Sequence, residues 1–174
     1  MPIGGELSDR QVGRLMEIVV HELRTAELPS PNVGEHEPVY TARCLQGPVR
    51  RVLGRLGIDG LIQAGEGGGR VRPVVLFGLR FYPDLAVVYH GAKTLAFEVK
   101  YLRASGRENA VATALGQTYL YRQAGYRRCG TFLVDITGRS SDAETIAAER
   151  ICRSAGIDVV VRRKLGQFLG QHPS

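Results

Sequence analysis

The order of strand-like and helix-like segments in the second half of the chain constrains the fold most. Apolar runs of strand length and longer amphipathic segments follow one another as strands at residues 74–81, 85–89 and 94–101, a helix at 107–124, a strand at 131–136, a helix at 142–155 and a strand at 157–161. Residues 90–93 contain a glycine and indicate a hairpin turn. The pattern predicts an antiparallel meander followed by further helices and strands. We expect a mixed α/β domain whose sheet has helices on both faces.

The first part of the chain is predicted to be helical. Ser8 or Asp9 can cap a helix that extends to about Leu28, because apolar residues recur there at helical spacing. A segment rich in proline then ends this helix. A second helix is predicted at residues 48–56, since Pro48 suits the first turn of a helix.

The length of 174 residues suits one domain with its own core. We therefore expect a single domain over residues 1–174, with an N-terminal helical part at 1–60 and a sheet core at 70–162. The glycine-rich residues 65–70 indicate a loop. This loop lacks the Gly-Lys-Ser or Gly-Lys-Thr ending of a P-loop, so we expect no nucleotide site there.

The charge of the chain is unevenly distributed. The formal net charge is +6, and from residue 43 onward there are twenty basic residues against ten acidic ones. A surplus of this size favours a polyanionic partner, nucleic acid before membrane. The alternative interpretation is that the basic residues serve solubility alone.

Cysteine and histidine usage argues against a zinc site. The three cysteines are widely spaced and indicate reduced core thiols, and the four histidines show no ligand spacing. Any metal is therefore expected to be a hard ion bound by oxygen. No apolar run approaches the roughly 20 residues that cross a bilayer, and the first residues lack the basic start of a signal peptide, so we expect a cytoplasmic protein without membrane contact.

Two neighbouring strands carry acidic residues where apolar ones are expected. Asp84 opens one strand, and Glu98 and Lys100 lie near the end of the next. Residues two apart in a strand point to the same side, so Glu98 and Lys100 project together. If Asp84 faces that side, two carboxylates repel each other unless a cation lies between them, and oxygen ligands suit Mg²⁺ or Mn²⁺. An ammonium group beside such an ion can orient a water for attack on a phosphodiester.

This arrangement depends on the register of the hairpin. A regular two-residue turn at Gly91 and Ala92 would pair Asp84 with Val99 and place the two acids on opposite faces. We therefore expect either an odd-length connection or a β-bulge between these strands.

These residues resemble the PD-(D/E)xK nuclease superfamily, which has a restriction-endonuclease-like αβββαβ core with a mixed central sheet flanked by helices. Pro83-Asp84 and, after thirteen intervening positions, Glu98-Val99-Lys100 stand in the family's order. Gln117 and Tyr121, one helical turn apart, are similar to the QxxxY element of RecB-like and lambda-exonuclease-like members. The resemblance covers about residues 74–136.

The resemblance implies the roles of the site residues. Asp84, Glu98 and the carbonyl of Val99 are implied as metal ligands, Lys100 as the residue near the nucleophile, and Gln117 and Tyr121 as further active-site residues. Many members add a glutamate from the first helix, and Glu22 is the better candidate here because it borders the apolar stripe of that helix. Arginines in this basic part of the chain are candidates for phosphate contacts, namely Arg50, Arg51, Arg55, Arg103 and Arg107.

The implied function is Mg²⁺-dependent hydrolysis of DNA phosphodiester bonds, with Mn²⁺ as a substitute, in restriction, defence, repair or recombination. A homodimer is expected for cleavage of both strands of a duplex. Two alternatives are a catalytically inactive nucleic-acid-binding subunit with the same fold and a nuclease directed at RNA. For the motifs taken singly, Asp84 is interpretable as a turn residue, Glu98 and Lys100 as a solvated strand face, and the arginines as ordinary surface charges.

Overall fold

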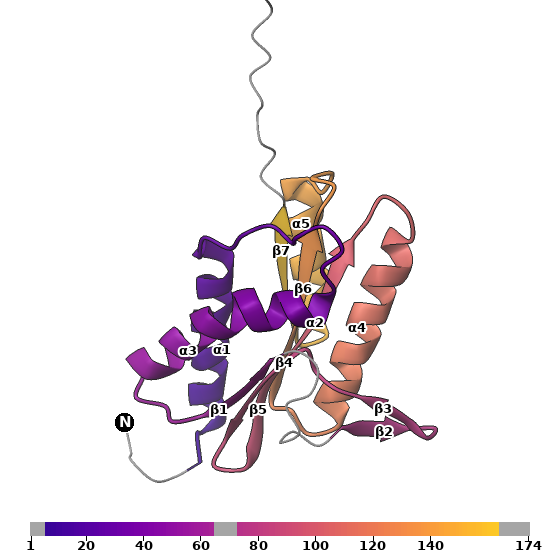
Figure 1. Ribbon diagram of the computed structural model, residues 1–174. Coiled ribbons are helices and arrows are strands. Elements are labelled where there is room, and N and C mark those ends of the chain that lie inside the picture. The colour runs from indigo at the N-terminus through magenta and orange to yellow at the C-terminus, as the bar shows by residue number, and fades with distance from the viewer. Residues whose placement is uncertain (1–5, 65–72, 164–174) are drawn as a thin grey trace, which may run out of the picture.

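The computed structural model describes residues 6–64 and 73–163, which form a mixed α/β fold around a five-stranded sheet (Figure 1). The strand order is β1-β4-β5-β6-β7. β4 is antiparallel to β1 and to β5, whereas β6 is parallel to both β5 and β7, so the sheet is mixed as predicted. The strands are β1 (Leu61–Ala64), β4 (Leu85–Tyr89), β5 (Ala92–Leu102), β6 (Arg128–Asp135) and β7 (Ile157–Arg163).

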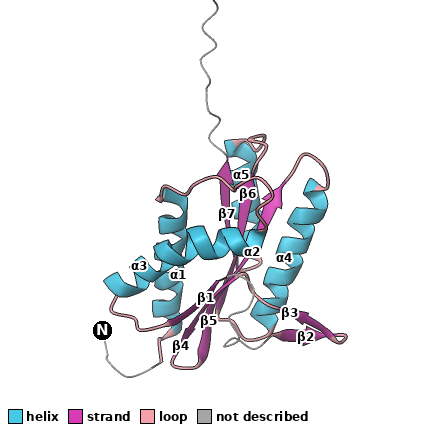
Figure 2. Cartoon of the chain, in the orientation of Figure 1, coloured by secondary structure: helices cyan, strands magenta, loops and turns pink. Residues whose placement is uncertain are grey.

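Helices flank the sheet, as the alternation of segments predicts (Figure 2). α1 (Asp9–Thr25) packs against β5, β6 and β7, and α4 (Arg107–Gln123) and α5 (Asp142–Ser154) pack on the opposite face. Ser8 and Ser141 cap α1 and α5, each within a reciprocal capping box. None of the helices in the described part of the chain is both long and apolar enough to span a membrane.

The expected strand at residues 74–81 is wrong as a member of the main sheet. This segment is a separate hairpin of β2 (Val74–Leu76) and β3 (Leu79–Phe81), which pair only with each other. The first strand of the meander is instead β1, which pairs with β4. Only four residues long, β1 is too short to show a clear alternation, and the glycine-rich residues 65–70 after it lie outside the described residues.

The second helix begins earlier than residue 48. Its segments are α2 (Glu37–Tyr40), a π-helical turn η1 (Thr41–Leu45) and α3 (Gln46–Arg55), and they follow one another without a break in helical backbone. Pro38 lies in the first turn, where a missing N–H costs no helical hydrogen bond. The π-helical turn adds a residue to the helical repeat, a feature that occurs often near functional sites.

The expected β-bulge is present between β4 and β5. Next to the turn, Val88 lies opposite Lys93, but one step further Val87 lies opposite Leu95. Thr94 is therefore the extra residue on β5, and its hydroxyl donates to the carbonyl of Ala92 at 3.0 Å. The shift restores a register in which Leu85 faces Phe97, so the residues that continue the two strands, Asp84 and Glu98, are brought level.

The core lies on both sides of the sheet. The large apolar side chains of β4 and β5, including Leu85, Leu95 and Phe97, are buried together with α1 and α3. The intervening alanines, Ala86 and Ala96, face the α4 side with Tyr121 and Tyr126. All three cysteines are buried and free, as the sequence predicts.

Candidate active site

The end of β5 extends beyond its neighbour β4. The ladder between them ends where Leu85 faces Phe97, so residues 98–102 have no strand partner on that side in the described part of the chain. Acidic side chains occupy the edge instead. The Val99 amide donates to Asp84 Oδ2 at 2.7 Å, and the Tyr101 amide donates to Glu37 Oε1 at 3.4 Å. The start of β4 and the start of α2 thus each bring a carboxylate to this edge.

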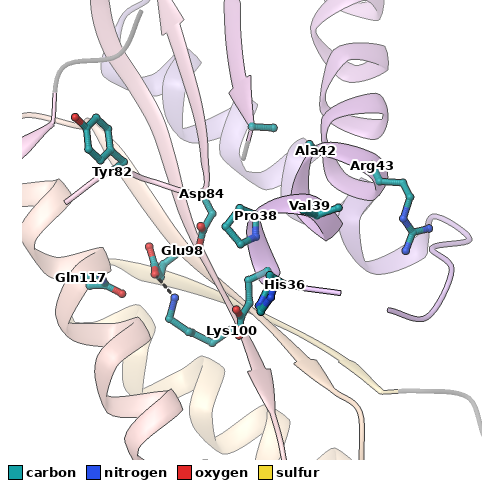
Figure 3. Close-up of a pocket in the computed structure, with 12 residues that line it drawn as sticks. His36, Pro38, Val39, Ala42, Arg43, Tyr82, Asp84, Glu98, Lys100 and Gln117 are labelled. Atoms are coloured by element: carbon teal, nitrogen blue, oxygen red, sulfur yellow. Dashed lines mark hydrogen bonds and ion pairs between the residues drawn. The ribbon is translucent and has the colours of Figure 1, made fainter. Parts of the chain in front are cut away.

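The structure brings Asp84, Glu98 and Lys100 together, as Figure 3 shows. Glu98 is only 2% exposed and projects from β5 toward α4. Lys100 Nζ donates to Glu98 Oε1 at 2.6 Å, and the Tyr121 hydroxyl donates to Glu98 Oε2 at 2.8 Å. Both oxygens of the second acid are therefore held in fixed directions.

Burial raises the pKa values of both carboxyl groups, and the charge of Glu98 adds to the shift of Asp84. Burial, and then the charge of Glu98, raise the pKa of Asp84 from 3.8 to about 7, although Lys100 and the Val99 amide act in the opposite direction. Burial likewise raises the pKa of Glu98 against the influence of Lys100 and Tyr121. Burial lowers the pKa of Lys100, but the attraction of Glu98 and Asp84 outweighs it, and the pKa is raised overall. The site therefore contains a fixed ammonium group and two carboxyl groups that a cation would stabilise in their ionised forms.

α4 supplies the two polar residues of the predicted QxxxY element. Tyr121 is fully buried, and its hydroxyl lies 2.9 Å from the carbonyl of Tyr82 as well as near Glu98. Gln117 lines the same cavity, and its Oε1 atom is buried without a hydrogen-bond partner in the structure. The small side chain of Ala114, one turn earlier, is fully buried and lets α4 lie close to the sheet.

The helical glutamate at the site is Glu37 and not Glu22, which corrects the sequence-based expectation. Glu22 faces α3, where it forms ion pairs with Arg51 at 3.3 Å and Arg55 at 2.6 Å, and it does not line the cavity. Glu37 lines the cavity with Asp84 and raises the pKa of that residue further. A proline directly after an acidic residue is a helix-start signal that could have identified Glu37.

These residues line an open cavity of about 1110 Å³. Its wall combines the start of the α2 helix, the β4 and β5 edge and the middle of α4 (Figure 3). Sequence reasoning missed several members of this wall, because their positions depend on where α2 begins. The described residues that line the cavity are His36, Glu37, Pro38, Val39, Ala42, Arg43, Ala64, Tyr82, Asp84, Glu98, Lys100 and Gln117.

The oxygen atoms at this edge fit a divalent cation of the Mg²⁺ type. In residues 6–64 and 73–163, no three Asp, Glu, His or Cys side chains gather closely enough to bind an ion by themselves. Mg²⁺ is commonly bound by one or two carboxylates and keeps several waters. Asp84 and Glu98 meet this requirement, and the carbonyl of Val99 leaves the strand on the same edge as its amide, which faces Asp84.

Arg107 has a structural role that the sequence did not reveal. Its guanidinium group donates to both carboxylate oxygens of Asp135 at 3.1 and 3.2 Å, and Asp135 is fully buried. The backbone amides of Thr137 and Ser140 donate to the same carboxylate. This network joins the start of α4 to the end of β6. The Arg107 guanidinium is therefore already bound to Asp135, and this ion pair competes with the expected phosphate contact.

The remaining candidate arginines lie outside the cavity wall. Arg51 and Arg55 pair with the α1 glutamate described above, Arg50 is exposed on α3, and the Arg103 guanidinium lies 5.6 Å from the centre of an aromatic ring on β5. Among the described residues, the arginine that does line the cavity is Arg43, which pairs with Glu35 at 2.7 Å. The structure therefore does not bring the predicted arginines into the site.

Comparisons with protein-family models, with curated proteins and with solved structures find no significant match to this chain.

Proposed function

We propose that this protein is a Mg²⁺-dependent nuclease of the PD-(D/E)xK type, with a restriction-endonuclease-like fold, that hydrolyses the phosphodiester bonds of DNA. The observation that carries the proposal is the meeting of Asp84, Glu98 and Lys100 in the wall of an open cavity. Two carboxylates and an ammonium group are suited to metal-assisted attack on a phosphodiester. The basic surplus of the chain supports a polyanionic substrate.

Each residue of the site has a distinct task in this mechanism. Asp84, Glu98 and the Val99 carbonyl would hold the ion, which when bound neutralises charge on the phosphate and acidifies a water molecule. Lys100 donates to Glu98 in this structure. If Glu98 held the ion instead of this ion pair, the ammonium group would be free to donate to the attacking water or to a phosphate oxygen.

Two residues of α4 assist: Tyr121 orients the Glu98 carboxylate, and Gln117 can contact water or substrate. Tyr121 holds one oxygen of Glu98 in place, so that the carboxylate keeps its direction when Lys100 moves away. Gln117 lines the cavity with a buried amide oxygen that lacks a partner, so it can accept a hydrogen bond from water or substrate. The described part of one chain contains one such site, and we propose that two copies act together when both strands of a duplex are cut.

The direct test is a cleavage assay on purified protein. Supercoiled plasmid, linear duplex, single-stranded DNA and RNA are incubated with Mg²⁺, Mn²⁺ or EDTA. We expect DNA cleavage with either metal and none in EDTA. Asp84→Asn and Lys100→Ala are expected to reduce cleavage at least about hundredfold, in the range of a lost catalytic group. Asp59→Asn, which removes an exposed carboxylate before β1, is the matched control and should cleave normally.

Three results would count against the proposal in different ways. Absence of metal-dependent cleavage combined with salt-dependent DNA binding would favour the inactive binding subunit. Cleavage of RNA alone would change the substrate class. Cleavage that persists unchanged in Asp84→Asn and Lys100→Ala would show that the activity does not come from this site.

A further inference from the structure

The hairpin of β2 and β3 carries an apolar end that no other described part of the protein covers. Figure 1 shows this hairpin standing out from the sheet beside one end of α4. Phe77 is 94% exposed at its tip, and Val75 and Leu79 are each 62% exposed. Leu76, opposite Leu79, is 40% exposed. Burial in this chain's own core therefore does not explain these side chains.

The turn at the tip holds Phe77 in a strained backbone conformation. Leu76 pairs with Leu79, so Phe77 and Gly78 are the two turn residues, with φ angles of 49° and 76°. Glycine and asparagine adopt such angles readily, whereas a bulky aromatic residue seldom does. Within residues 6–64 and 73–163, the other non-glycine residue with a positive φ angle is His90, in the β4–β5 turn, and histidine tolerates the conformation better. An exposed phenylalanine kept at a strained position suggests a function for its ring.

The hairpin is connected directly to the candidate active site. Its base is anchored because Val74 and Phe81 pack against the buried cluster around Tyr121. The next residue, Tyr82, accepts a hydrogen bond from Tyr121 through its carbonyl and lines the cavity. Asp84 follows two positions later, so the tip and the first acid are separated by only six residues of chain.

We propose that the hairpin tip is a stacking platform for the substrate, in which the Phe77 ring packs against an unpaired base of the strand whose phosphate enters the cavity. This proposal rests on the proposed nuclease function. Aromatic rings that present a free face stack on bases of any sequence, and apolar wedges separate base steps. The occupant is thus a nucleic-acid strand with an exposed base, such as a single strand or a frayed duplex end.

Charge and continuity favour nucleic acid over a protein partner. Arg80 is exposed on the hairpin and lies opposite Val75, so a basic group accompanies the apolar side chains. Tyr82, which is 47% exposed, is a second aromatic residue between the hairpin and Asp84, and it lines the cavity. A strand whose phosphate lies at Asp84 and Glu98 would meet the hairpin if it runs past Tyr82, and Arg80 could then contact its backbone.

The test measures stacking and cleavage separately. Single-stranded and blunt duplex DNA containing 2-aminopurine are titrated with the full chain in EDTA, where metal-dependent cleavage cannot occur. The protein has no tryptophan, so the fluorescence change reports on the base analogue. The KM for cleavage of the same DNA is measured in Mg²⁺.

Phe77→Asn removes the ring and suits the positive φ angle, so it keeps the turn intact. We expect it to weaken single-strand binding at least about tenfold, to abolish the 2-aminopurine quenching and to raise the KM. Phe77→Tyr should restore all three values. Ile146→Ala, which truncates an apolar side chain of α5 that is 66% exposed, is the matched control and should leave them unchanged.

The outcomes separate this inference from the nuclease proposal. If the wild type cleaves DNA and Phe77→Asn binds and cleaves equally well, the stacking role is wrong and the nuclease function stands. If quenching depends on Phe77 but no variant cleaves, the stacking role stands and the catalytic proposal fails. Absence of DNA binding in both conditions overturns both. A change from dimer to monomer in Phe77→Asn with unchanged DNA affinity would assign the hairpin to self-association instead.

Discussion

Replacing Asp84 with asparagine is expected to stabilise the protein in the absence of metal. Burial and the charge of Glu98 raise the pKa of Asp84 from 3.8 to about 7. The unfolded chain thus releases this proton near pH 3.8, whereas the folded chain keeps it to about pH 7. The folded state binds more protons within this window, so the free energy of unfolding falls as the pH rises through it. Asparagine carries no proton to lose and avoids that fall.

The magnitude follows from the two pKa values. The difference between 3.8 and about 7 is equivalent to about 4 kcal/mol above pH 7. The side-chain oxygen of asparagine can still accept from the Val99 amide, so the hydrogen bond is kept. For a domain of this size, that free energy corresponds to a rise in Tm of roughly 10 °C. Below about pH 3, where Asp84 is neutral in both states, the variant and the wild type should unfold at the same temperature.

Thermal unfolding followed by circular dichroism in EDTA, from acid to alkaline pH, measures this effect. Asp59→Asn serves as the control because it removes an exposed carboxylate, and its Tm should follow that of the wild type. Saturating Mg²⁺ should raise the Tm of the wild type but not that of Asp84→Asn, since a ligand stabilises only the state that binds it. Equal Tm values for wild type and Asp84→Asn at alkaline pH in EDTA would refute the electrostatic description of the site.

Three further changes test other parts of the structure. Lys100→Ala is expected to lower kcat at least about hundredfold while Mg²⁺ binding, measured by calorimetry, persists. Tyr121→Phe removes one hydroxyl that holds the second carboxylate, and it should lower kcat about tenfold and weaken Mg²⁺ binding, with unfolding easier by about 1 kcal/mol. Gly130→Ala would place a methyl group 2.5 Å from the Phe97 ring, and urea unfolding should show a loss of about 1–3 kcal/mol. Gly116→Ala, whose added methyl meets nothing within 4 Å, is its control and should gain about 1 kcal/mol, because alanine favours a helix.

The strands from β4 onward could be predicted because their apolar residues are buried. Each of these strands places large side chains in the core, so the run of apolar residues in the sequence indicates a buried strand. The segment at residues 74–81 was misassigned for the opposite reason. Its apolar side chains between residues 75 and 79 are exposed, so the apolar run does not indicate a core strand, and the dipeptide Phe77-Gly78 marks a turn within it.

The start of the second helix was hidden by its π-helical turn. Tyr40 and Leu45 are both buried but lie five positions apart, whereas Leu45 and Val49 are separated by the usual four. A search for apolar residues at a constant helical period therefore finds only the later part of this helix. Glu37, at its start, is missed for the same reason, and the expectation falls on Glu22 in the first predicted helix instead.

The convergence of the two acids follows from core packing rather than from the turn. The turn at His90 and Gly91 sets one register at its own end of the hairpin. Without the bulge, that register would place Leu85 opposite Ala96 and Asp84 opposite Phe97. Large side chains of one strand would then lie opposite small or polar side chains of the other. Burial of Leu85 beside Phe97 demands a shift of one residue, which Thr94 absorbs as the bulge. Because the same shift sets Asp84 level with Glu98, a variant that lost the alignment of the acids would also have to unpack the core.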